Sequence, residues 1–153
     1  MSRPETDADE PASKARLRLW LRLLRLTRTI ESDLRENLRR DHGTTLPRFD
    51  VMAALSRHRD GLRMSQLSGV LRVSNGNVTG IIDRLVEDGH VERVPVQGDR
   101  RASHVRLTAA GQDEFARQAA AHEVWIDKAL ENLDPQEAHA MTQRLALLVK
   151  KES

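Results

Sequence analysis

The sequence has no cysteine, no long apolar run and almost no excess of charge of one sign. The missing cysteine excludes disulfides, cysteine-ligated zinc and thiol redox sensing. The longest apolar run is five residues, too short to cross a membrane, and the acidic start MSRPETDADEP lacks the apolar core of a signal peptide. We therefore expect a cytoplasmic protein with no membrane partner. The formal net charge of +2 does not by itself indicate a nucleic-acid partner.

The residues that are present suit a globular chain of ordinary size. At 153 residues it can bury a core, and 39% hydrophobic with 31% charged residues is typical of soluble folded proteins. The cations are nearly all arginine, the exceptions being Lys14, Lys128, Lys150 and Lys151. Arginine suits phosphate and base contacts, although genomic base composition produces the same bias.

Long helices are expected at both ends. Residues 1–13 have no apolar periodicity and are expected to form a mobile tail. Helical spacing of leucines predicts a helix over 14–40, ended by Gly43. Near the other end, Asp134, Pro135 and Glu137 have the order of a helix cap, a first-turn proline and a capping box. An amphipathic helix over 138–151 is predicted to follow.

Shorter elements are expected in the middle of the chain. Ser65, Ser74 and Thr108 are the predicted caps of three helices, and Asp60-Gly61 is a turn signal. Pro95 cannot donate to a sheet, so its strand is expected to have an open edge. The predicted helices are 47–58, 65–71, 75–88 and 108–130, and the predicted strands are 91–96 and 105–107.

This order predicts a mainly α fold with a small β-hairpin wing. The expected organisation is a tail over 1–13, a helical dimerisation region over 14–45 and 109–153, and a winged helix-turn-helix DNA-binding domain over 46–108. The terminal helices carry apolar stripes that the small middle domain could not cover. Burying them against a second copy in a twofold dimer is the simplest solution, and an intramolecular bundle is the alternative.

The helix over 75–88 separates apolar from polar residues. At about 100° per residue, Val78, Ile82 and Leu85 share the core side, and Gly76 and Gly80 lie opposite. Each glycine costs about 1 kcal/mol relative to alanine, so close approach to a groove wall would explain them. A solvent-facing helix with tolerated glycines is the alternative. The predicted DNA-binding residues of this region, which offer base-edge or phosphate contacts, are Ser65, Ser74, Asn75, Asn77, Thr79 and Arg84.

The connection between the two predicted strands is basic. It places Arg100 and Arg101 at an exposed tip, and a narrow minor groove attracts arginine. Asp99 is close enough in sequence to hold one of them by a charge-assisted hydrogen bond, so all three are predicted DNA-binding residues. A solvated charged turn is the alternative for a single hairpin. Helix, turn, helix and basic hairpin in succession are much rarer and indicate a winged helix-turn-helix.

From Lys14 to its C-terminus the chain resembles the MarR family of bacterial transcription regulators. The matching segments are VSNGNVTGIIDRL (73–85), DGHVER (88–93) and the wing pattern Asp99-x-Arg101-x-x-x-Val105-x-Leu107-Thr108, followed by Gly111. The resemblance implies a homodimeric repressor that binds a pseudo-palindromic double-stranded operator, with the terminal helices as dimer interface. Arg101 matches the arginine that enters the minor groove and Asp99 its acidic companion. The recognition-helix roles would fall on Ser74, Asn75, Asn77 and Thr79.

The family resemblance also implies a small-molecule effector. Family effectors commonly bind between the dimerisation helices and the DNA-binding lobe, and they weaken DNA binding. The segments LRLWLRLL, GTTLPRFDVMAAL and HEVWI resemble a subgroup that responds to aromatic acids or their coenzyme A thioesters. Packing in the core or dimer interface is the alternative role for the rings among the candidates. The candidate effector-binding residues are Trp20, Arg25, Arg48, Phe49, His122 and Trp125.

Two other classes of function compete with this hypothesis. An enzyme is not expected, because the six histidines form no HxH or HExxH spacing and no phosphate-binding glycine loop is present. No cofactor, metal or catalytic residue is therefore predicted. A winged-helix protein-interaction module without DNA binding is the stronger rival. It predicts no gel retardation of DNA at low salt and no effect of replacing Arg101.

Overall fold

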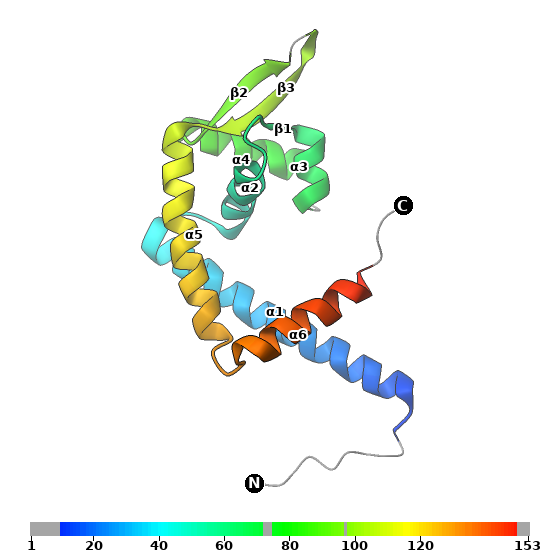
Figure 1. Ribbon diagram of the computed structural model, residues 1–153. Coiled ribbons are helices and arrows are strands. Elements are labelled where there is room, and N and C mark those ends of the chain that lie inside the picture. Colours follow the sequence, from blue (N-terminus) through cyan, green and yellow to red (C-terminus); the bar gives the residue numbers. More distant parts are fainter. Residues whose placement is uncertain (1–9, 72–74, 97, 150–153) are drawn as a thin grey trace. The chain divides into compact units, whose positions relative to one another are not determined.

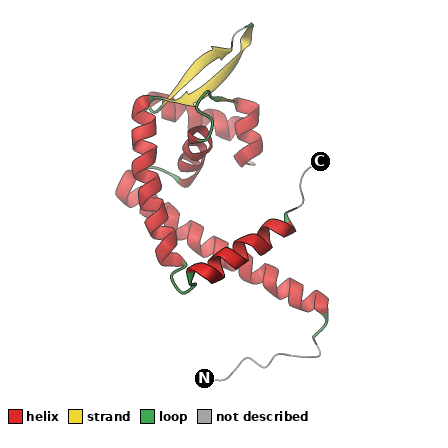
Figure 2. Ribbon diagram, in the orientation of Figure 1, coloured by secondary structure: helices red, strands yellow, loops and turns green. Residues whose placement is uncertain are grey.

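The computed structural model describes residues 10–71, 75–96 and 98–149 (Figure 1). The chain forms two compact units, one ending at Leu46 and the other beginning at Pro47. Helices dominate, and the strands form a single small sheet in the second unit (Figure 2). The predicted mainly α class with a small β wing is confirmed. Within the described ranges, no helix is both long enough and apolar enough to cross a membrane.

The first unit is dominated by α1, which spans Ala12–His42. The predicted stop is confirmed: Gly43 has a left-handed φ of 59°, and its N–H donates to the carbonyl of Arg39. The N-terminal half of α1 exposes several large apolar side chains to solvent. Its exposed large apolar side chains are Leu17, Leu19, Trp20, Leu21 and Leu26.

The second unit contains the other helices, at bounds close to those predicted. They are α2 (Leu46–Ser56), α3 (Met64–Leu71), α4 (Asn75–Glu87), α5 (Ala109–Ala129) and α6 (Pro135–Leu148). Thr108 caps α5 as predicted, because its side chain accepts from the Gly111 N–H at 3.0 Å. The predicted capping box of α6 also forms. The N–H of Glu137 donates to Asp134 at 2.8 Å, which stabilises the carboxylate and lowers the pKa of Asp134.

The sheet contains one strand that the sequence did not predict. Its strands are β1 (Leu62–Arg63), β2 (Val91–Val96) and β3 (Asp99–Leu107), in the antiparallel order β1-β3-β2. A two-residue strand such as β1 shows no alternation of apolar and polar residues, so nothing in the sequence marks it. The expected open edge at Pro95 is confirmed, because β2 lies at one edge of the sheet.

Two local expectations were wrong. β3 begins at Asp99 rather than at Val105, so Arg100 and Arg101 belong to a strand and not to a turn. Ser65 does not cap α3, because the helix already begins at Met64, directly after β1. The Gln66 side chain does part of the capping instead, accepting from the Arg63 N–H at 2.8 Å.

The core of the second unit lies where α2, α3 and α4 meet the sheet. Its members include Met52, Leu55, Leu67, Ile82, Leu85 and Val105. The start of α5 is held against the turn that follows α4. Thr108 donates from its N–H to the His90 carbonyl at 3.0 Å and from its hydroxyl to the Gly89 carbonyl at 2.7 Å. A Cβ at Gly111 would lie 1.9 Å from the His90 oxygen, so only glycine permits this approach.

Candidate nucleic-acid interface

The helix α4 has the two faces that its sequence predicts. Val78, Ile82 and Leu85 are buried in the core, whereas Asn77 and Thr79 are exposed. Gly80 is also exposed, and a Cβ built on it meets no atom within 4 Å. The polar face of α4 is therefore open at its middle, where a helix backbone could approach a groove closely.

One exposed ion pair links α4 to the hairpin beside it. Asp83 accepts a hydrogen bond from the Arg93 guanidinium of β2, ten residues away in the sequence. The predicted DNA-binding residue Arg84 is exposed and pairs with Asp88, one helical turn on, at 3.3 Å. The Asp83–Arg93 pair was missed because no helical or strand spacing connects the two residues.

The hairpin β2–β3 is the predicted wing. Glu92 and Arg106 lie opposite each other in the ladder and pair at 2.7 Å between Oε1 and Nε. The register shifts near the tip, from Pro95 opposite Ser103 to Val96 opposite Asp99. Between these two pairs, β3 therefore has more residues than β2, which is a bulge close to the tip of the hairpin.

Only part of the predicted DNA-binding set can be placed in the structure. Asn77, Thr79 and Arg84 lie together on α4, and Ser65 is exposed in the first turn of α3. Ser74 lies outside the described residues. Four further predictions concern side chains that the structure does not describe, and they stay predictions: Asn75, Asp99, Arg100 and Arg101.

The structure brings together two of the six candidate effector residues. The rings of Phe49 and His122 stack with centroids 4.7 Å apart, and burial lowers the pKa of His122. Phe115, which the sequence did not single out, packs against Phe49 at 5.6 Å. Phe115 and His122 are seven residues apart on α5, a helical spacing that would have found it. The stacked rings agree equally well with the alternative of core packing.

The other four candidates are distributed over both units. Arg48 and Trp125 are half-buried in the second unit. Trp20, with 56% of its surface exposed, and Arg25 lie on α1 in the first unit. Among the residues that the structure describes, no cluster of histidine and acidic side chains could hold a metal ion.

A small cavity in the second unit was not predicted. It measures about 140 Å³ and lies between the end of α2, the end of β3 and the first half of α5. Cavities of about 150 Å³ hold one benzene ring. Its lining mixes apolar, polar and cationic side chains, namely Leu55, Ser56, Arg59, Leu107, Gln112 and Phe115.

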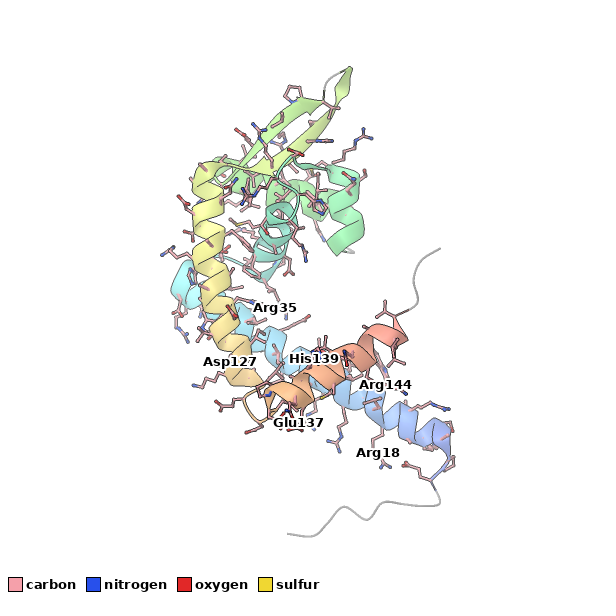
Figure 3. All side chains as sticks on the ribbon, in the orientation of Figure 1. Arg18, Arg35, Asp127, Glu137, His139 and Arg144 are labelled. Carbon is pink, nitrogen blue, oxygen red and sulfur yellow. The ribbon has the colours of Figure 1, made fainter. Side chains whose placement is uncertain are left out.

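The helix α6 contributes nothing to a buried core. None of its residues is buried, and Figure 3 labels Glu137, His139 and Arg144 along it. It nevertheless carries large apolar side chains that are exposed to solvent, among them Met141, Leu145, Leu147 and Leu148.

These elements define a class of protein. A helix, a short strand, two helices and a two-stranded hairpin in this order form a winged helix-turn-helix lobe. Residues 42–102 match the family model described as MarR family. The chain is also 34% identical to a solved MarR family transcriptional regulator from Silicibacter pomeroyi, over 92% of this chain and 96% of that one, with a TM-score of 0.75. The chain belongs to the MarR family.

Two further relatives extend the comparison. The transcriptional activatory protein BadR of Rhodopseudomonas palustris is 40% identical over 46% of this chain and 41% of its own length. A mutant MarR from E. coli, solved in complex with operator DNA, has a TM-score of 0.75 over 92% of this chain and all of its own, and at 22% identity it shares the fold. The chain spans less than two thirds of the length of the first curated relatives that it matches. These relatives are named as transcriptional regulators and not as enzymes.

Proposed function

We propose that this protein is a transcription regulator that binds a pseudo-palindromic DNA operator through α4 and the wing. The observation that supports this most strongly is the outward face of α4. Asn77, Thr79 and Gly80 are exposed on that face, whereas the apolar residues of the opposite face are buried. Asn and Thr side chains can bond base edges, and the glycine permits close approach. The neighbour solved with operator DNA supports this placement of the lobe.

The regulator works as a homodimer built from its terminal helices. Trp20 on α1 is 56% exposed and Leu147 on α6 is 77% exposed, in company with other large apolar residues of both helices. Large apolar surfaces that are exposed to solvent mark interaction sites, and a second copy of the chain is the simplest partner. Sedimentation equilibrium is expected to give twice the chain mass of 17.3 kDa. A monomer at micromolar concentration would contradict the dimer.

An effector releases the operator and so relieves repression. An effector shifts the equilibrium only by binding the DNA-free conformation better. Phe115, whose ring packs on Phe49 beside His122, lines the 140 Å³ cavity, which has room for the ring of an aromatic acid or of its coenzyme A thioester. Calorimetric titration with benzoic and hydroxycinnamic acids and their thioesters tests this part. Absence of both binding heat and operator release would contradict it.

Gel retardation with the DNA that flanks the gene tests the function as a whole. The wild-type protein is expected to retard this DNA in preference to a scrambled duplex, and to act on it in the cytoplasm as a repressor. A reporter carrying the same DNA should then be more active when the gene is deleted. The relative BadR is named an activatory protein, so the opposite reporter response would identify activation as the mode. Absence of any retardation would favour the protein-interaction module.

A further inference from the structure

Three arginines gather at one corner of the second unit, and none of them pairs with a carboxylate of the described residues. Arg57 and Arg59 follow α2, and Arg63 ends β1; all three are exposed. They line one groove, together with His104 of β3 and Gln66 of α3. We call Arg57, Arg59 and Arg63 the arginine corner.

The arginine corner differs in its pairing from three other described arginines of the lobe. Arg84, Arg93 and Arg106 each have a carboxylate partner within 3.5 Å. In the part of the chain that the structure describes, no carboxylate lies within ion-pair distance of the three corner arginines, although Asp60 lies in the same turn. An ordinary solvated surface intersperses its charges with opposite ones, whereas this groove keeps an excess of positive charge.

The backbone that carries the arginine corner is held in one conformation. The Gly61 N–H donates to the His58 carbonyl at 2.8 Å. Gly61 has a φ of 103°, and a Cβ there would lie 2.9 Å from the Val105 oxygen, so the turn packs directly on β3. At the other end, the Arg63 N–H is bound by the Gln66 side chain. The backbone of the turn is therefore already in place for binding an anion, and the entropy that is lost comes from ordering the three arginine side chains.

The groove lies beside α3, the first helix of the helix-turn-helix, and β3, a strand of the wing. Arg63 is opposite His104 in the sheet, and α3 begins at the next residue. The first helix of a helix-turn-helix crosses the DNA backbone. His104 is five residues from Asp99 along β3, which is at most about 17 Å of extended strand. That distance is about half of one DNA turn, so one duplex can reach both the wing tip and the groove.

We propose that the arginine corner binds phosphates of duplex DNA beside the operator half-site. This proposal rests on the proposed function and assigns it a contact surface that neither the recognition helix nor the wing includes. Guanidinium groups match phosphate oxygens with two parallel hydrogen bonds. Backbone contacts of this kind strengthen binding and position the protein without reading sequence.

The dependence of DNA binding on salt tests the arginine corner. Fluorescence anisotropy is measured between 50 and 200 mM salt for wild type and for the double variant Arg57→Gln/Arg59→Gln. Raising the salt over this range weakens binding about 3.5-fold for each phosphate that the protein neutralises. A variant that neutralises two fewer phosphates per protomer should therefore lose about 12-fold less affinity than wild type does. The reduction should be the same on operator and scrambled duplexes. The matched control Arg117→Gln/Lys128→Gln removes two exposed cations from α5 and should keep the wild-type salt dependence.

The possible outcomes separate this proposal from the proposed function. A wild-type salt dependence in the corner variant overturns the proposal. A variant that no longer distinguishes operator from scrambled DNA also overturns it, because phosphate contacts carry no sequence information. In both cases preferential binding of the operator by the wild type keeps the proposed function intact. Wild type that binds neither duplex at low salt overturns both.

Discussion

Alanine at Gly80 should stabilise the protein and weaken its DNA binding. Gly80 lies in the interior of α4, is exposed, and has open space where a Cβ would be added. Replacing glycine by alanine in a helix interior contributes about 0.8–1.0 kcal/mol of stability. Denaturant unfolding should show this gain at unchanged m-value, together with a rise of about 3 °C in the melting temperature.

The same methyl group should interfere with DNA if the α4 backbone approaches the groove. Overpacking a close contact costs about 1–3 kcal/mol, which corresponds to about 5- to 150-fold weaker operator binding. Gly69→Ala in α3 is the matched control, because that glycine is also exposed with no atom within 4 Å of an added Cβ. It should give the same gain in stability with a smaller loss of operator affinity, because α3 crosses the DNA backbone and does not enter the groove. A Gly80→Ala protein that is more stable and binds operator as tightly as wild type would refute the close-approach argument.

Three further predictions concern the lobe that carries the interface. Gly111→Ala should destabilise the protein by about 3 kcal/mol in denaturant unfolding, because its Cβ would collide with the His90 carbonyl; an unchanged midpoint would contradict the packing of α5. Ile82→Ala should cost about 2–5 kcal/mol by the same assay, since the side chain is fully buried, and a loss of stability below about 1 kcal/mol would contradict the burial of this face of α4. Burial lowers the pKa of His122 from its usual 6.5, so the unfolded state takes up the proton first and the free energy of unfolding should fall as pH drops below about 6.5. His122→Phe should reduce this pH dependence, and an identical pH profile would show that His122 does not contribute to it.

Elements with strong local signals were predictable from the sequence. The ends of α1, α5 and α6 follow from Gly43, Thr108 and Asp134, whose backbone and side-chain bonds are local. The apolar face of α4 follows from helical periodicity alone. β1 was not predictable, because two residues that pair with a strand over forty positions away have no local pattern.

The candidate site was predictable only in part, for the same reason. The polar face of α4 is a property of one helix, so its residues could be grouped from spacing. The Asp83–Arg93 pair and the groove of the arginine corner depend on how β1, β2 and β3 meet the helices. Only the tertiary packing brings such residues together. The 140 Å³ cavity is likewise shaped by side chains from three separate elements.

The central claim is that α4 and the wing together bind DNA, and Arg101→Ala tests it most directly. Operator affinity is titrated for wild type and variant at several salt concentrations, using the DNA that flanks the gene. The account predicts preferential wild-type binding, weaker binding by the variant, and a salt slope that is smaller by about 1 for each phosphate that the wing no longer neutralises. Equal affinity and equal salt slope of wild type and Arg101→Ala would contradict it.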